Sequence, residues 1–342
     1  MKKKIDIYFI AKEAGVSIAT ISRFFNNSLV VGEVTREKIL NVCNKYNYKP
    51  SKIASALSTK RTKSIALLIP SIKNPAFNSL VDGVGTIVSK RGYSLTLFNT
   101  KESIEKELEI LDIINNRSID GAIVSGVYGR EEDRLFISEV EKRKIPCILV
   151  DRYIPDTDIP YVASNDYLGG KIAARFILEN NHKNIGIISY ETRVHIFKER
   201  VRGFTDVLKK EGIKEKYVIE VPRQIGKIEE NLIKNRKALL EALLNDQVTI
   251  IFNAADFIAI ELIKFLSENK IRVTEDVSVM GYDNILFSNF TVPRLSTIDH
   301  TMFEMGYTAA DNLINKLEKN RFKDRIVIMD PKLVIRNSVR KI

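Results

Sequence analysis

Short apolar segments alternate with stretches of helical periodicity from residue 64 onward, and this alternation constrains the fold more than any other feature. Consecutive parallel strands need a crossover, usually a helix, so an alternating pattern predicts parallel sheets with helices on both faces. The pattern forms two successive sets of about four strand–helix units. We therefore expect an α/β core of two lobes, each built on a doubly wound parallel sheet.

The expected elements of this core are short strands separated by longer helices. Strands are expected at 65–69, 94–98, 121–125 and 146–150, then at 185–189, 217–221, 249–252 and 277–282, with two more at 325–329 and 332–335. Helices are expected at 77–90, 104–115, 132–143, 168–179, 199–210, 231–244, 257–268 and 302–319. The last two strands must join one or both lobes.

The first sixty residues have a different pattern, which predicts three short amphipathic helices. We expect them at 8–14, 18–25 and 36–47. Gly15 is suited to ending the first helix, and Ser17 and Thr35 are suited to capping the second and third. Two helices joined by a short turn form a helix-turn-helix, whose second helix enters the major groove of DNA.

Positive charge is concentrated in the same segment. Residues 1–63 hold 13 Lys and Arg against four Asp and Glu, whereas the rest of the chain is almost neutral, with 41 against 39. This distribution favours a polyanion as partner. Arg23 can pair with guanine, and Ile18 or Ala19 can contact a thymine methyl group. The alternatives are a solubilising basic tail and a helical bundle that binds no nucleic acid.

Residues 10–23 (IAKEAGVSIATISR), Asn26, 35–39 (TREKI) and 48–51 (YKPS) resemble the headpiece of the LacI/GalR family of bacterial transcription regulators. Phe9 replaces the usual Asp of the family, and we expect Asp6 to cap the first helix instead. The resemblance implies a double-stranded, pseudo-palindromic DNA operator as partner. The DNA-binding residues that we expect are Ser17, Ile18, Ala19, Thr20, Ser22, Arg23, Asn26, Ser51, Ala54 and Leu57.

By the same resemblance, residues 1–49 form the helix-turn-helix domain and residues 50–62 form a hinge helix or linker. Leu57 occupies the family position that wedges into the minor groove at the centre of the operator. Such a wedge unstacks a base step and bends the duplex, which allows more contacts to phosphate. The alternative is that Leu57 packs on a neighbouring domain.

The resemblance continues through the rest of the chain and implies a periplasmic-binding-protein-like core. The segments that carry it are 74–77 (NPAF), 150–152 (VDR), 200–204 (RVRGF), 254–256 (AAD), 276–284 (DVSVMGYDN) and 293–298 (PRLSTI). It implies an N-terminal lobe of residues 63–161 and 293–324 and a C-terminal lobe of residues 162–292 and 325–342. We expect a homodimeric repressor of carbohydrate-utilisation genes, controlled by a sugar or sugar derivative, in the bacterial cytoplasm at the nucleoid.

Polar residues that follow strands are the candidates for effector binding, because open α/β sheets bind ligands at the carboxyl ends of their strands. The candidates are Phe77, Asp151, Arg200, Asp256 and Asp283. The alternatives are that Phe77 packs inside a lobe, that Asp151 caps a helix, that Asp256 ties down its loop and that Asp283 caps a turn. Weaker candidates are Arg152, Arg193 and His195, whereas His182 and His300 are interpreted as structural.

Two features of the candidate site differ from typical sugar-binding members of the family. The chain has no Trp, and Ala255 stands where an amide that binds hydroxyls is common. An acidic or phosphorylated sugar therefore becomes more plausible than in a typical member. We still expect a neutral sugar first.

Several other classes of protein conflict with the sequence. Two cysteines exclude a disulfide framework or a Cys-based zinc finger. No apolar run reaches the roughly 18 residues of a membrane span, and no secretory signal is expected. The segment 83–85 (GVG) lacks the third glycine of a dinucleotide fingerprint and lies inside a helix. We expect no enzyme, catalytic residue, cofactor or metal. The alternatives are an activator with the same architecture and a sugar-binding protein of a transport or sensing system.

Overall fold

The computed structural model describes residues 5–26, 30–48, 61–126, 133–154, 157–190, 194–215, 217–222, 227–245 and 247–342. The chain forms two compact units, Met1–Lys63 and Ser64–Ile342, and each is described by itself. Among the described residues, every helix is too short or too polar to cross a membrane.

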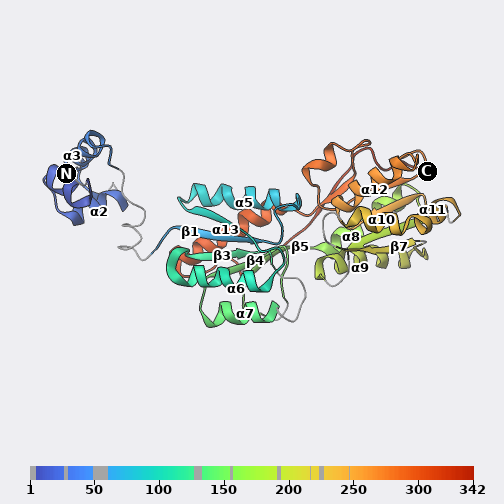
Figure 1. Cartoon of the computed structure of the whole chain (residues 1–342), viewed down its shortest axis with the longest axis horizontal. Coiled ribbons are helices and arrows are strands. Elements are labelled where there is room, and N and C mark those ends of the chain that lie inside the picture. The colour runs from blue at the N-terminus through green and yellow to red at the C-terminus, as the bar shows by residue number, and fades with distance from the viewer. Residues whose placement is uncertain are drawn as a thin grey trace. The chain divides into compact units, whose positions relative to one another are not determined.

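The first unit contains helices α1 (Ile7–Ala14), α2 (Ile18–Asn26) and α3 (Glu33–Lys45) (Figure 1). The backbone N–H of Phe9 donates to Asp6 at 3.0 Å, which confirms the expected cap of α1. Gly15 ends this helix in the left-handed region (φ 64°), as predicted. Ser17 accepts from the N–H of Thr20 at 3.1 Å and caps α2, also as predicted.

The start of α3 differs from the prediction. The helix begins at Glu33, after Gly32 in the N-cap position, so Thr35 lies inside the first turn instead of capping it. Glycine is a tolerated N-cap, and the acidic Glu33 in the first turn interacts favourably with the helix dipole. The three helices enclose a small core of Ile10, Ala11, Ala14, Ile21, Phe24, Val31, Ile39 and Cys43.

The second unit begins with a six-stranded parallel sheet, which is the centre of the N-terminal lobe. Its strand order is β11-β5-β4-β3-β1-β2. The strands are β1 (Ser64–Ile69), β2 (Ser94–Asn99), β3 (Gly121–Val124), β4 (Cys147–Val150), β5 (Tyr161–Ser164) and β11 (Ile326–Met329). The helices of this lobe are α5 (Ala76–Lys90), α6 (Ile104–Ile113), extended by the π-helical segment η2 (Ile114–Ser118), α7 (Asp133–Lys142) and α13 (Met302–Lys319).

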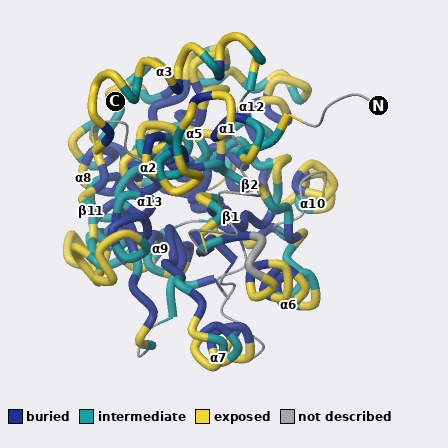
Figure 2. Tube along the Cα trace, turned by 90° about the vertical axis from the view of Figure 1, so that its left-hand side faces the viewer, coloured by how far each residue is buried: buried dark blue, intermediate teal, exposed yellow. Residues whose placement is uncertain are grey.

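Alternate residues of β1 explain how helices cover both faces of this sheet. Ile65 and Leu67 point into a cluster with α5 and α13, whereas Ala66 and Leu68 point into a cluster with α6 and α7. Figure 1 shows these two helix pairs on opposite sides of the sheet. In Figure 2, α6 and α7 carry both buried and exposed residues, as expected for helices that cover a sheet with one face.

The C-terminal lobe contains a four-stranded parallel sheet of order β7-β6-β8-β9. Its strands are β6 (Ile185–Tyr190), β7 (Tyr217–Val221), β8 (Ile250–Asn253) and β9 (Ser278–Met280). Its helices are α8 (Asp166–Glu179), α9 (His195–Lys210), α10 (Ile228–Lys234), α11 (Arg236–Leu244) and α12 (Asp256–Glu268), followed by the 3₁₀ segment η3 (Leu286–Asn289). One face of this four-stranded sheet packs on α8 and α9, and the other face packs on α10, α11 and α12. The single helix expected at 231–244 is thus divided at Asn235.

The division of residues between the lobes corrects the expectation for two segments. We expected 162–292 and 325–342 in the C-terminal lobe, but β5 and β11 pair in parallel within the N-terminal sheet. Helix α13 packs on that sheet, so the strand that follows it reaches the free edge of β5. The next strands, β10 (Thr297–Asp299) and β12 (Lys332–Val334), form a separate antiparallel pair.

Candidate functional site

Residues from both lobes line a small internal cavity beyond the carboxyl ends of the strands. Its lining residues are Asn74, Ala76, Phe77, Asp151, Arg152, Tyr190, Ile196, Phe197, Arg200, Ala255, Phe257, Asp283, His300 and Met302. Four of the five predicted effector residues are therefore brought together, and Asp256 is not among them. The cavity has a volume of about 20 Å³, enough for roughly one water molecule. A larger molecule can enter only if the lobes or the lining side chains move.

Arg200 lies at the centre of this site and is almost fully buried. Its Nε donates to Asp166 at 2.7 Å, and its Nη1 donates to Asp283 at 2.8 Å and to the carbonyl oxygen of Ala254 at 2.9 Å. The guanidinium also lies 3.9 Å from the ring centroid of Tyr282. A buried cation is tolerated only when it is paired in this way. Burial lowers the pKa of Arg200, but the carboxylates of Asp166 and Asp283 more than offset this effect and leave it raised.

Asp166 is a member of this cluster that the sequence analysis missed. It begins α8, directly after Asn165, whose side chain caps that helix by accepting from Leu168 at 3.1 Å. The hydroxyl of Tyr282 donates to Asp166 at 3.2 Å. Burial raises the pKa of Asp166, and the adjacent Arg200 opposes that shift. An Asp at the start of a helix that follows a strand is a sequence signal for a cavity residue. The strand β5 is absent from the predicted strands, so this signal is not visible at Asp166.

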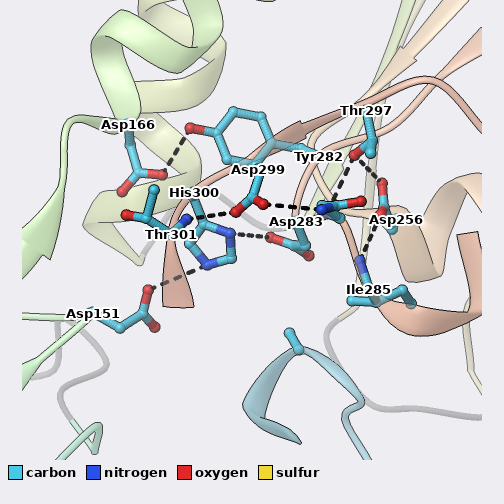
Figure 3. A network of polar contacts seen from close by, with 12 residues as sticks. Asp151, Asp166, Asp256, Tyr282, Asp283, Ile285, Thr297, Asp299, His300 and Thr301 are labelled. Atoms are coloured by element: carbon cyan, nitrogen blue, oxygen red, sulfur yellow. Dashed lines mark hydrogen bonds and ion pairs between the residues drawn. The ribbon is translucent and has the colours of Figure 1, made fainter. Parts of the chain in front are cut away.

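His300 lies between the carboxylates of two other predicted residues (Figure 3). Its Nε2 is 3.8 Å from Oδ1 of Asp151, and its Nδ1 is 3.6 Å from Oδ1 of Asp283. Burial raises the pKa of Asp151 to about 6, against the attraction of Arg152. Burial also raises the pKa of Asp283 despite its bond to Arg200, and burial lowers the pKa of His300. His300, which was interpreted as structural, is buried and also lines the cavity.

Asp256 lies outside the cavity lining, in contrast to the prediction that it binds the effector. Its two carboxylate oxygens accept from the hydroxyl of Thr297 at 2.6 Å, the hydroxyl of Ser288 at 2.5 Å and the N–H of Ile285 at 3.0 Å. Figure 3 shows these contacts to Thr297 and Ile285. The side chain is fully buried and outside the cavity lining. Asp256 therefore ties down the loop after β9, which was the alternative interpretation.

The weaker candidates divide between the cavity and its surroundings. Arg152 lines the cavity with its guanidinium 6.0 Å from the ring centroid of Phe77. Phe77 also belongs to the core of the N-terminal lobe, so its ring packs in that core and lines the cavity. His195 contacts Tyr153 at 3.5 Å and is not a lining residue. Arg193 lies outside the described residues.

His182 has the structural role expected for it. It is buried between the hydroxyl of Thr249 at 2.8 Å and the carbonyl oxygen of Arg340 at 2.9 Å. Among the described residues, no group of three or more His, Cys, Asp or Glu side chains is arranged to hold a metal ion.

The first unit presents its predicted contact residues on the surface of α2 and the turn before it. Ser17, Ile18, Ala19 and Arg23 are exposed, and Thr20 and Ser22 are half-buried, whereas Ile21 and Phe24 face the core. Asn26 is the last residue of α2, and the structure does not describe its side chain. Ser51, Ala54 and Leu57 lie outside the described residues. The arrangement leaves one face of α2 available for a groove of DNA.

Comparisons with known proteins agree with both units. Residues 6–51 match the family model of bacterial regulatory proteins of the lacI family, and residues 62–337 match that of periplasmic binding proteins and the sugar binding domain of the LacI family. The transcriptional repressor PurR of Actinobacillus pleuropneumoniae serotype 3 is 32% identical over 97% of this chain and 98% of its own length. The ribose operon repressor of Halalkalibacterium halodurans is 30% identical over 97% and 96%.

Solved structures show the same fold at lower sequence identity. The lac repressor dimer bound to operator and an anti-inducer matches with a TM-score of 0.82 at 20% identity, covering 98% of this chain and 99% of that one. A LacI-family regulator from Enterococcus faecium with bound ribose matches with a TM-score of 0.71 at 23% identity, covering 82% and 99%. The sequence relatives above are transcriptional repressors, not enzymes. The chain therefore belongs to the LacI family of bacterial regulatory proteins and is a transcriptional repressor with a DNA-binding headpiece and a ligand-binding core.

Proposed function

We propose that this repressor controls carbohydrate genes and that its effector is a small neutral sugar or sugar derivative bound between the two lobes. The observation that carries the proposal is the cavity that combines Arg200 and Asp283 with the aromatic rings of Phe77, Tyr190 and Phe197. Charged donors and acceptors make the stronger hydrogen bonds to hydroxyl groups, and apolar rings suit the faces of a sugar. The solved regulator from Enterococcus faecium, which has the same fold, holds ribose, a small neutral sugar.

The charges around the cavity favour a neutral ligand over an acidic one. Among the described residues, three carboxyl groups (Asp151, Asp166 and Asp283) surround two guanidinium groups (Arg152 and Arg200). Arg200 already donates to two of those carboxylates. Both guanidinium groups thus already have carboxylate partners, and an anionic ligand would have to displace those partners in a site of low dielectric. We therefore expect an acidic or phosphorylated sugar to bind more weakly than a neutral sugar.

A ligand screen on the full chain tests this proposal. Neutral pentoses and hexoses, sugar acids, sugar phosphates and purine bases are compared by the shift they cause in thermal unfolding, because binding to the native state stabilises it. We expect a neutral sugar to give the largest shift and to change retention of the protein on operator DNA. A response to purine bases or sugar phosphates alone would contradict the proposal.

Two matched pairs of variants place the effector. Asp283→Asn removes one charged partner of a ligand hydroxyl and should weaken sugar binding about ten- to hundredfold. Asp256→Asn changes a buried carboxylate outside the cavity and should leave the affinity within about twofold. Arg200→Lys keeps the charge but loses the fork geometry, so it should weaken binding. Arg202→Lys, on an exposed part of the same helix, should not. Equal affinities within each pair, measured by calorimetry, would contradict this site.

We propose that the headpiece binds a pseudo-palindromic DNA operator as part of a homodimer in the bacterial cytoplasm, at the nucleoid. The exposed Ile18, Ala19 and Arg23 on α2 support direct contacts to base edges. Arg23→Ala should reduce operator affinity by about 1–3 kcal/mol and relax base preference at one position. Selection of DNA from a random pool with both proteins measures this effect. An unchanged preference would contradict the role of Arg23.

An exposed apolar segment of the C-terminal lobe supports the homodimer. Leu286, Phe287, Phe290 and Val292 are all exposed, with Phe290 at 71% and Val292 at 89%. Large exposed apolar side chains close together in one segment mark protein interfaces, and two helix-turn-helix units need two copies to fill successive major grooves. Phe290→Asp should convert a dimer to a monomer in sedimentation experiments at micromolar concentration. A monomeric wild type, alone and on DNA, would contradict the proposal.

A reporter gene under the selected operator measures repression in the cell. We expect expression to rise when the chain is deleted from the cell. Unchanged or reduced expression would contradict repression from the selected operator.

A further inference from the structure

We propose that closure of the two lobes takes up one proton, which is shared among Asp151, His300 and Asp283. The three residues come from different parts of the core: Asp151 follows β4 of the N-terminal lobe, Asp283 follows β9 of the C-terminal lobe, and His300 lies between β10 and α13. His300 is 3.8 Å from the first carboxylate and 3.6 Å from the second (Figure 3). This residue therefore connects one lobe to the other through two buried acidic groups.

The number of protons on the three side chains determines how many hydrogen-bond donors they have. A neutral imidazole has one N–H donor and one nitrogen that only accepts, whereas an ionised carboxylate only accepts. With both carboxylates ionised and His300 neutral, one carboxylate would face a nitrogen lone pair. Neither Nδ1 of His300 nor Oδ1 of Asp151 has a hydrogen-bond partner among the described residues. One additional proton gives both contacts a donor, so the bridged arrangement favours its uptake.

The other charged groups around His300 determine where this proton resides. Arg200 donates to Asp283 and Asp166, and Arg152 forms an ion pair with Asp151 at 3.6 Å. The ring of Tyr282 lies 6.0 Å from that of His300, and its hydroxyl donates to Asp166. Burial, and after it the nearby guanidinium of Arg200, lower the pKa of His300 and disfavour an imidazolium, against the opposing effect of the Asp283 backbone. The proton is therefore shared mainly by the two carboxyl groups, with His300 as the link, and the three groups titrate as one unit.

The backbone at both carboxylates is consistent with a functional arrangement. Asp151 has a φ of 68° and Asp283 a φ of 124°, in the region that side chains other than glycine rarely adopt. Such strain persists only where the surrounding structure holds it in place, and it is frequent at switch regions. Asn284 and Thr301, the chain neighbours of Asp283 and His300, also have positive φ, of 53° and 64°.

The direction of the pH dependence follows from comparing closed and open lobes. In open lobes, exposed Asp side chains are ionised above pH 4, and an exposed His gains its own proton only below about pH 6.5. Above that pH, the closed arrangement holds one proton more than the open one. The ratio of closed to open molecules should then fall as pH rises, by at most tenfold per pH unit for one proton. Below about pH 6 the ratio should be nearly constant. This inference does not depend on which effector binds.

Fluorescence energy transfer on the full chain without effector tests the proposal. Dyes are attached at Glu141→Cys on α7 and Lys237→Cys on α11, which are exposed positions on different lobes. Cys43 and Cys147 are buried, and the unsubstituted protein reports any labelling of them. We expect the closed fraction to decrease steadily from pH 6.5 to 8.5. A closed fraction that is independent of pH in this range would overturn the proposal.

Three variants make the result specific to His300. His300→Gln keeps one donor and one acceptor between the carboxyl groups but cannot take up a proton when the lobes open, so its closed fraction should keep rising as the pH falls below 6.5, where that of the wild type is nearly constant. His182→Gln alters a buried histidine of the C-terminal lobe and should retain the wild-type pH dependence. In Asp151→Asn, the amide donates permanently to His300 and replaces the additional proton, so the lobes should stay closed at pH 8.5. A constant closed fraction below pH 6 in His300→Gln, or wild-type pH dependence in Asp151→Asn, would overturn the proposal. Because Asp151→Asn keeps the shape of the side chain, it tests the proposal even if His300→Gln fails to fold.

Discussion

The helix-turn-helix unit and the cavity between the lobes use side-chain hydrogen bonds in different ways. In the helix-turn-helix unit, the caps are local: Asp6 accepts from the N–H of Phe9 and Ser17 accepts from the N–H of Thr20, each three residues along the chain. An exposed hydrogen bond from the hydroxyl of Tyr46 to Glu13 joins residues that are distant in the sequence. In the cavity, Arg200 bonds to residues 34 and 83 positions away. Loss of a local cap disturbs one helix end, whereas loss of Arg200 leaves buried charges from separate segments without a partner.

The largest effect should therefore come from Arg200→Ala. Removing one member of a buried ion pair costs about 3–5 kcal/mol, because the remaining carboxylates stay buried without compensation. Urea unfolding of the full chain measures the loss for the second unit. Arg202→Ala is the control, since that guanidinium is half-exposed, forms an ion pair with Glu199 on the same helix and lies 4.3 Å from the ring centroid of Tyr167. A loss below about 1 kcal/mol for Arg200→Ala would contradict the importance of these long-range bonds.

The second prediction concerns the other buried aspartate of the C-terminal lobe. Asp256→Ala removes the acceptor for Ser288, Thr297 and the N–H of Ile285, and should cost about 2–3 kcal/mol. Asp256→Asn keeps one carbonyl oxygen and should cost less. Urea unfolding gives both values. If Asp256→Ala were as stable as the wild type, its bonds would not hold the loop after β9.

These contacts also explain which parts of the molecule could be predicted from the sequence. Gly15, Ser17 and Asp6 were predicted because their partners lie within a few residues, and most strands of the core were predicted from their apolar runs. Thr35 was misplaced because Gly32 starts α3 earlier than the cap preference indicated. Local pattern is therefore sufficient for elements and caps, with an error of a few residues at their ends.

The errors in the candidate site have a different cause. Asp256 and Asp283 both follow strands of one sheet, so sequence position could not distinguish the loop residue from the cavity residue. The position of His300 in the site depends on its contacts with Asp151 and Asp283, which belong to different lobes. The pairing of β11 with β5 likewise depends on which sheet edge is free after α13 has packed. These features depend on contacts between distant segments, which no local pattern encodes.

Gly169→Ala tests the tight packing of α8 against the long-range cluster. A Cβ at this position would lie 2.0 Å from the hydroxyl oxygen of Tyr282, the residue that donates to Asp166. We expect a loss of about 1–3 kcal/mol in unfolding free energy, because the ring must shift within a packed interior. Gly85→Ala on α5 is the control, since its Cβ would meet nothing within 4 Å and alanine favours the helix. Equal stability of the two variants would contradict this account of the packing.

The smallest effects on stability should be found in the first unit. Ser17 caps α2, whereas Thr35, which the sequence suggested as a cap, lies inside α3. Ser17→Ala removes the acceptor for the N–H of Thr20 and should destabilise α2 by about 1 kcal/mol. Thr35 lies inside α3, and alanine is the better helix former there, so Thr35→Ala should be neutral or slightly stabilising. Hydrogen exchange of the full chain reads each helix separately. Ser17→Ala should speed exchange in α2 about fivefold, which corresponds to a cap worth about 1 kcal/mol, whereas Thr35→Ala should not speed exchange in α3. Faster exchange in α3 of Thr35→Ala would restore Thr35 as a cap and would move the start of that helix toward the position expected from the sequence.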